Sequence, residues 1–318
     1  MNGPLVSIIC FCKNRHTFIR RCIESILNQD YENFEFLIQD GASTDGTVEI
    51  IKEYRDQRIK LVSEPDSGPG EAFMRAMSRI RGDIWGSCLS DEELFPHAIS
   101  WAVSTFANRH DTAVIYGDCH VIDECGAIIE SCRSPQWDYL KYLCCEIVPP
   151  FSATFLRTAC FRKIGFDRYT GCGEFDLWLR MGKLFEIEYI PEFVSKFTRH
   201  KGGGTSTVED FYKTLPGRIK AIEKICDATD TPEYIKGHRN VALGGLHLWI
   251  AQNFITNHHY REAGAMIIAS LEYTPRREYV EMVCRAFAQT VGIEAVIGEY
   301  QPVMTAVAQY LDALEQQR

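Results

Sequence analysis

Residues 34–47 read FEFLIQDGASTDGT, an apolar run that leads into a cluster of turn-forming residues. Similar apolar runs occupy residues 5–11 and 59–62, and each run is followed by turn formers and then by apolar residues at helical spacing. Short apolar runs bounded by turn residues predict buried strands, and their alternation with helices predicts a mostly parallel sheet with right-handed crossovers. We therefore expect an α/β fold whose ligands bind outside the carboxyl ends of the strands.

The second part of the chain has a different pattern. Residues 83–200 mix helices with strands, which we expect at 113–116 and 185–190, whereas helical spacing alone continues from about residue 215. We therefore expect one α/β domain over residues 1–214 and an all-α region over residues 215–318.

Apolar residues at helical spacing between residues 246 and 271 predict a helical hairpin that turns at residues 256–260. Their aromatic and small side chains slightly resemble a tetratricopeptide repeat. Because about three such repeats are needed to form a stable stack, a helical extension of the first domain is the simpler interpretation.

The composition excludes several classes of protein. The chain has 318 residues, 46% of them apolar, and a net charge of −9. An acidic chain lacks the cationic surface that phosphate backbones require, so we expect no binding of nucleic acid. Neither an apolar run of about 18 residues nor a basic leader is present, which predicts a cytoplasmic protein.

The cysteines do not suggest disulfides or a thiolate metal site. There are 13 of them, an odd number, and neither a Cys-x-x-Cys pair nor an HExxH motif occurs. This usage is typical of reduced thiols in a cytosolic protein. We interpret Cys144 and Cys145 as small buried apolar residues.

Residues 82–92 read as a further strand that ends in two adjacent carboxylates. Acidic residues thus follow three of the predicted strands: Asp40, Asp66 and the pair Asp91-Glu92. Adjacent carboxylates repel each other unless a cation balances them, and hard divalent cations such as Mg²⁺ or Mn²⁺ prefer oxygen ligands and bridge to phosphates. An acidic run also commonly begins a helix, so this pattern alone leaves both interpretations open.

Eight segments of residues 4–206, taken together, resemble the family 2 glycosyltransferases, which have the fold called GT-A. Three of them match the family patterns DGxSTDGT, SExDxG and SDDxxxP, and a fourth, Glu174-Phe-Asp-Leu-Trp-Leu-Arg180, is similar to EDYDLWLR. The eight segments, in chain order, are VSIIC with the following Asn14-Arg15 turn, QDGASTDGT, SEPDSG, SDEELFP, YGD, VIDECG, GFD and GEFDLWLR.

The resemblance implies a site for a nucleotide-diphosphate sugar donor. Asp40 would accept a hydrogen bond from the nucleotide base, because an ionised carboxylate suits an N–H donor. Asp66 and Arg75 would line the diphosphate and sugar region, where the guanidinium fork suits phosphate oxygens. Asn14 would also belong to the donor site. A solvated helix face is the alternative for Arg75.

The resemblance also implies a metal site with Mn²⁺ or Mg²⁺ as cofactor. Asp91 would contact the ribose or sugar beside the metal, and Glu92 would hold the metal against the diphosphate. His200 would complete the metal shell as a neutral imidazole, and the glycines at 202–204 would form a loop over the diphosphate. A surface loop beside an ordinary histidine is the alternative.

Glu174 is the expected general base of an inverting transfer. A carboxylate near the anomeric carbon would take the proton of the attacking acceptor hydroxyl, and carboxylates also stabilise an oxocarbenium-like transition state. Asp176 is the alternative base. If a helix starts here, Asp176 points elsewhere and caps the helix or pairs with Arg180.

Three positions depart from the family pattern: Glu92 and Glu174 replace aspartates, and Met74 replaces an asparagine. Both carboxylate charges are kept, so an active glycosyltransferase remains the leading hypothesis. A catalytically silent binding protein whose helical region recruits partners is the hypothesis from another class.

The expected partners are the nucleotide-diphosphate sugar and a hydroxyl of a glycan, lipid-linked or protein-linked acceptor. A lipid-linked acceptor would require peripheral association with the inner face of the membrane, although no strongly basic amphipathic helix is evident. The sugar, the linkage and the oligomeric state do not follow from the sequence.

Overall fold

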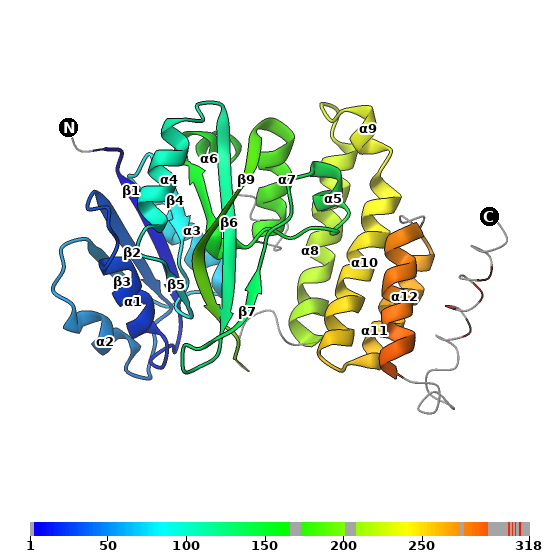
Figure 1. The fold of residues 1–318 in the computed structure, drawn as a ribbon, viewed down its shortest axis with the longest axis horizontal. Helices are drawn as coiled ribbons and strands as arrows, with labels where there is room; N and C mark the ends of the chain where they lie inside the picture. The colour runs from blue at the N-terminus through cyan, green and yellow to red at the C-terminus, as the bar shows by residue number, and fades with distance from the viewer. Residues whose placement is uncertain are drawn as a thin grey trace. The chain divides into compact units, whose positions relative to one another are not determined.

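A computed structural model describes residues 3–165, 173–200, 208–273 and 277–291, together with isolated positions between 305 and 312. The chain forms two compact units, each assembled from separate segments (Figure 1). The sheet unit comprises Met1–Trp137, Pro149–Arg168 and Arg180–Lys201, and the helical unit comprises Asp138–Val148, Tyr169–Leu179 and Gly202–Arg318.

The sheet unit begins with four parallel strands in the order β3-β2-β1-β4. The sheet continues through β8, β6, β9 and β5, where β6 and β9 pair in parallel and the other pairs are antiparallel; β7 pairs with β6 at the side. The strand bounds are β1 Val6–Cys12, β2 Phe34–Asp40, β3 Ile59–Ser63, β4 Ile84–Ser87, β5 Glu92–Leu94, β6 Thr112–Ile122, β7 Ile128–Cys132, β8 Thr154–Arg157 and β9 Glu186–Thr198.

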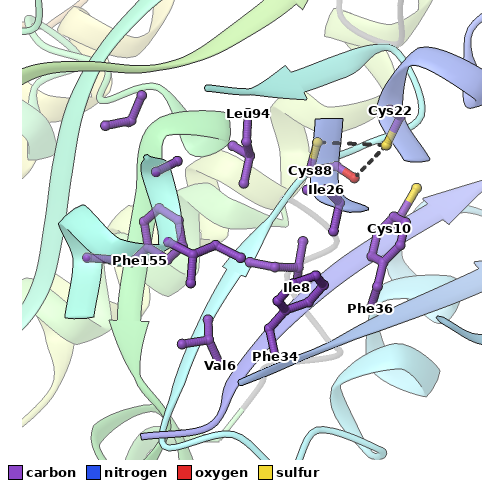
Figure 2. Packing of buried hydrophobic residues seen from close by; sticks show 14 of the residues in the cluster. Val6, Ile8, Cys10, Cys22, Ile26, Phe34, Phe36, Cys88, Leu94 and Phe155 are labelled. Atoms are coloured by element: carbon purple, nitrogen blue, oxygen red, sulfur yellow. Dashed lines mark hydrogen bonds between the residues drawn. The ribbon is translucent and has the colours of Figure 1, made fainter. Parts of the chain in front are cut away.

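Helices cover both faces of the parallel strands. Alternate residues of β1 point to one face, where Val6, Ile8 and Cys10 pack in a cluster that includes Ile26 of α1 (Figure 2). Phe11 points to the other face and meets Phe73 of α3, edge to face, with ring centroids 6.3 Å apart. The helices of this unit are α1 Ile19–Leu27, α2 Thr47–Glu53, α3 Pro69–Met77, α4 Ala98–Ala107 and α6 Thr158–Ile164.

Burial on both faces explains why β1 and β2 read as continuous apolar runs rather than as alternating patterns. The third predicted strand forms as β3, but the prediction that it is buried is wrong: β3 lies at the end of the strand order and none of its residues is buried. The α/β fold predicted from the sequence is confirmed, and so is the helical C-terminal region. The strands expected at 113–116 and 185–190 correspond to β6 and to β9, which begins one residue later and extends to Thr198.

In the helical unit, α10 and α11 form the predicted hairpin, and the turn between them occupies residues 257–259. Gly245 lies within α10, where a Cβ atom would come within 2.1 Å of the carbonyl oxygen of Cys144. The absence of a side chain therefore lets the segment 139–148 lie against this helix. The helices are α5 Tyr139–Leu143, α7 Glu174–Leu184, which continues into the sheet unit, α8 Val208–Asp227, α9 Glu233–Lys236, α10 Arg239–Thr256, α11 Tyr260–Leu271 and α12 Arg277–Val291.

The domain boundary predicted at residue 214 falls within α8 and stays a prediction. The cysteines among the described residues are free, and Cys144 and Cys145 are buried, as expected. Cys145 adopts a left-handed backbone (φ 57°) at the end of α5, where the amide of Glu146 donates to the carbonyl of Lys141. This arrangement ends the helix with a Schellman motif. None of the described helices combines the length and the apolar character needed to span a bilayer.

Candidate active site

Asn14 joins the loops that follow β1 and β2. Its backbone is left-handed (φ 53°), a conformation that asparagine tolerates better than most residues. Its amide N–H donates to Ser43 Oγ at 2.7 Å, and its side-chain oxygen accepts from the amide of Thr44 at 2.9 Å. Asn14 therefore holds the loop that carries the DGAST sequence against the end of β1.

Asp40 lies at the end of β2 and is fully buried. Its carboxylate accepts from the amide and hydroxyl of Ser43 and from the hydroxyl of Ser63, with distances of 2.9 Å to the amide and 2.6 Å to Ser63 Oγ. Cys12 Sγ approaches it at 3.7 Å. The carboxylate therefore fixes the ends of three neighbouring strands, and its contact with a base stays a prediction.

Asp66, in the loop after β3, lies beside the DGAST loop. Its Oδ1 accepts from the amide of Gly68 at 2.9 Å. A Cβ atom on Gly41 would come within 2.6 Å of Asp66 Oδ2. Glycine at position 41 therefore leaves room for the Asp66 carboxylate, and the predicted donor residues Asn14, Asp40 and Asp66 gather at one edge of the sheet.

Arg75 on α3 pairs with carboxylates rather than presenting a free guanidinium. It lies 2.9 Å from Glu64 Oε1 and 2.6 Å from Glu71 Oε1, and it also donates to the carbonyl of Pro65. Hydrogen bonds from the hydroxyl and amide of Ser67, together with Arg75, lower the pKa of Glu71 to about 2. A diphosphate would have to compete with these partners for Arg75.

Asp91 and His200 lie in contact, as the predicted metal site requires. Strand β5 pairs with β9 in antiparallel register, and the amide of Thr198 donates to the carbonyl of Asp91. This pairing places His200 Nε2 2.9 Å from Asp91 Oδ2, with the imidazole ring packed on Phe18. His200 is 5% exposed, so little of its ring faces solvent.

Glu92 begins β5, and its Oε2 accepts from the amide of Leu89 at 2.7 Å. A carboxylate and an imidazole within 3 Å form a donor set that Mn²⁺ or Mg²⁺ accepts. Within the described ranges, no group of three His, Cys, Asp or Glu side chains is arranged to hold a metal ion. Asp91 and His200 are therefore in contact, and a metal site formed by Asp91, Glu92 and His200 stays a prediction.

Glu174 lies in the helical unit, where it is the first residue of α7 and lines a cavity of about 160 Å³. The residue is exposed, so solvent reaches it, but the concave surroundings still desolvate its carboxyl group. This desolvation raises the pKa of Glu174, and the positive charge of Arg218 opposes the shift. A raised pKa is suited to a carboxylate that takes a proton near neutral pH. The alternative base, Asp176, is buried in the same helix.

Arg218 was not among the residues singled out from the sequence. Its guanidinium carbon lies 4.7 Å from the ring centroid of Trp249 and 5.1 Å from that of Phe175. Arg218 follows Phe211 by two helical turns, so the sequence places both on one face of α8. The sequence gives no sign of the helix that this face meets, because Trp249 lies far along the chain.

The predicted site residues fall into two groups. The sheet unit carries the donor and metal residues, and the helical unit carries Glu174. The donor and metal residues are Asn14, Asp40, Asp66, Arg75, Asp91, Glu92 and His200. Residues 202–204 lie outside the described residues.

A sequence model described as Glycosyl transferase family 2 matches residues 7–160. The chain is 26% identical over 207 residues to a chondroitin synthase of Pasteurella multocida, an alignment that covers 64% of this chain and 21% of the synthase. The chain thus spans about a fifth of the length of that relative.

Two solved structures share the fold. The TarS fragment 1–349 of S. aureus, in complex with UDP-GlcNAc, is 18% identical with a TM-score of 0.64, and the superposition covers 96% of this chain and 91% of TarS. The mannosyltransferase PcManGT of Pyrobaculum calidifontis, in complex with GDP-Man and Mn²⁺, is 16% identical with a TM-score of 0.58, covering 97% and 84%. The family match over residues 7–160 and the GT-A fold around them support a family 2 glycosyltransferase.

Proposed function

We propose that the chain transfers one sugar from a nucleotide-diphosphate donor to an acceptor hydroxyl with inversion at the anomeric carbon. The observation that carries this proposal is Glu174, a carboxylate with a raised pKa in a solvent-accessible cavity. Support comes from the family match and from the structural neighbours, whose complexes hold UDP-GlcNAc or GDP-Man.

In the proposed reaction, Glu174 accepts the proton of the acceptor hydroxyl while that oxygen attacks the anomeric carbon. The bond between the anomeric carbon and the diphosphate oxygen breaks, and the nucleoside diphosphate leaves with the bonding electrons. A single displacement of this kind inverts the configuration. General-base assistance typically contributes about 10²- to 10⁴-fold to the rate.

The donor would lie at the edge of the sheet, against the loops that follow β1, β2 and β3. Asn14 and Asp40 would line the part of the site that binds the nucleotide, and Asp66 would contact the sugar region. Arg75 would exchange a carboxylate partner for a phosphate oxygen, which its planar fork can accept in two hydrogen bonds.

Asp91, His200 and Glu92 would hold Mn²⁺ or Mg²⁺, with the remaining positions left to diphosphate oxygens and water, as these cations commonly require. When bound, the cation neutralises the charge that develops on the leaving diphosphate. The neighbour complex with Mn²⁺ supports this assignment.

We further propose a glycan, lipid-linked or protein-linked hydroxyl as acceptor and a cytoplasmic location. A lipid-linked acceptor would bring the protein to the inner face of the membrane.

The test compares Glu174→Gln with the wild type. Transfer from a panel of UDP-, GDP- and dTDP-sugars should fall by at least about 10²-fold, because the amide cannot accept the proton. Donor affinity, measured by calorimetry with Mn²⁺, should stay close to that of the wild type.

Glu209→Gln is the matched control, since it removes one carboxylate from the helical unit at a position outside the cavity lining. Wild-type turnover by Glu174→Gln would exclude Glu174 as the base.

A further inference from the structure

The cavity of the helical unit is lined by Arg218, whose charge acts on Glu174 and whose side chain donates no hydrogen bond to any other residue that the structure describes. Arg218 forms no hydrogen bond or ion pair within the described part of the chain, and its Nε is buried without a partner. Burying a charged donor without a partner is costly, so such a group points to a ligand that completes it.

The guanidinium of Arg218 contacts two aromatic rings. Its carbon Cζ lies 5.1 Å from the ring centroid of Phe175 and 4.7 Å from that of Trp249, and these cation–π contacts offset part of the desolvation cost. Such contacts do not engage the guanidinium N–H groups in hydrogen bonds to oxygen. The guanidinium fork matches the oxygens of a carboxylate or phosphate.

The other walls of the cavity suit a sugar ring. Tyr142, Phe211 and Trp249 supply aromatic surface, and the side-chain amide of Asn253 donates to the carbonyl of Trp249 at 2.7 Å. This hydrogen bond leaves the side-chain oxygen of Asn253 as an acceptor for a hydroxyl. The volume of about 160 Å³ is close to the roughly 150 Å³ that accommodates a benzene ring, so one monosaccharide ring is the scale of the site.

We propose that this cavity is an acceptor subsite for a negatively charged sugar, whose carboxylate or phosphate binds Arg218. The inference rests on the proposed function, in which Glu174 of the same cavity takes the acceptor proton. Arg218 is then a specificity residue, because its fork is satisfied by a charged sugar and left incomplete by a neutral one.

The test is calorimetric titration of the full-length protein with glucuronic acid, glucose 6-phosphate and glucose. We expect at least one charged sugar to bind at least about 10-fold more tightly than glucose, since hydrogen bonds to charged groups are the strong ones. A preference for glucuronic acid identifies a carboxylate ligand, and a preference for glucose 6-phosphate identifies a phosphate. Equal binding of all three sugars, or no binding of either charged sugar, would overturn the proposal.

Arg218→Met, which keeps the apolar stem, should abolish the preference. Arg285→Gln removes one positive charge from an exposed position of the same unit and should retain it. If Arg218→Met does not fold, Asn253→Asp provides the second variant, because a second carboxylate in the cavity, added to that of Glu174, should weaken binding of the charged sugar more than binding of glucose. A preference that survives in a folded Arg218→Met protein would also overturn the proposal.

Binding in these titrations needs neither donor nor turnover. If Glu174→Gln transfers sugar normally and the preference for a charged sugar is intact, Glu174 is not the general base but the subsite hypothesis stands. If Glu174→Gln loses transfer and no preference for a charged sugar is found, the subsite hypothesis fails but Glu174 remains the base.

Discussion

At the scale of single residues, Glu174 and Arg218 give the helical unit a measurable response to pH. Desolvation raises the pKa of Glu174, and Arg218 opposes that rise by attraction. A general base works only in its deprotonated form, so transfer should decrease as the pH falls through the raised pKa. Replacing Arg218 with methionine removes the opposing charge, so the acid limb of the kcat/KM profile should move to higher pH.

The pH at which the acid limb falls is compared after the kcat/KM profile of each variant is normalised to its own maximum. This step is needed because Arg218→Met also lowers acceptor affinity under our proposal. Arg285→Gln should leave the limb where the wild type has it. A limb that stays in place or moves to lower pH in Arg218→Met would show that the titrating group is not Glu174.

Gly41 tests the geometry of the donor edge. A methyl group at this position would come within 2.6 Å of Asp66 Oδ2, so the Asp66 carboxylate must move away from its present position. We expect Gly41→Ala to cost about 1–3 kcal/mol of folding free energy, as overpacking usually does, and to weaken donor binding at least about 10-fold. Thermal unfolding and calorimetric donor titration measure the two effects.

Gly70→Ala is the control for that variant, because no atom lies within 4 Å of a Cβ at Gly70 on α3. It should keep wild-type affinity and stability. Normal donor binding by Gly41→Ala would mean that the donor does not depend on the contact between these two loops.

At the scale of elements, strands and helices with local patterns were predictable, whereas their distant partners were not. The apolar runs of β1 and β2 and the helical spacing of the α10–α11 hairpin show the burial of these elements locally, whereas β3, also predicted as a buried strand, has no buried residue. Glu92 was expected at the end of a strand, but it begins β5, whose partner β9 lies about a hundred residues away. No local sequence pattern predicts the pairing of β5 with β9.

The same distinction applies to the candidate site. The i,i+4 spacing of Glu71 and Arg75 predicts their ion pair. Glu64, the second carboxylate that pairs with Arg75, comes from the preceding loop and has no such spacing. Asp40 could be placed at a strand end, but its complete burial depends on Ser63 from the neighbouring strand. Arg218 was missed because its ring partners come from two other helices.

Helix α10 offers a case where helix propensity and packing predict opposite results. Replacing a glycine inside a helix with alanine usually stabilises it by up to about 1 kcal/mol. At Gly245 the new methyl group would come within 2.1 Å of the Cys144 carbonyl oxygen. We expect Gly245→Ala to lower the free energy of unfolding by about 1–3 kcal/mol, measured by urea denaturation. A more stable variant would show that the segment 139–148 does not need this contact.

At the scale of the whole molecule, the helical unit takes its residues from three separate parts of the chain. Residues 138–148 and 173–179 precede the long helices, yet they pack with them: Cys144 lies against Gly245, and Phe175 against Arg218. Truncation of the chain at a single position therefore cannot remove the whole helical unit. It would expose apolar surface on the earlier segments of that unit, which remain.

A fragment of residues 1–214 tests this directly. It keeps Tyr142 and Phe175 but loses Trp249 and Arg218, so the aromatic walls of the cavity would face water. We expect its melting temperature to fall by at least about 5 °C, since a loss of 1 kcal/mol corresponds to about 2–4 °C at this size. Equal melting temperature and cooperativity for residues 1–214 would instead support two consecutive domains with a boundary at residue 214, because no stabilising contact would then be lost with the long helices.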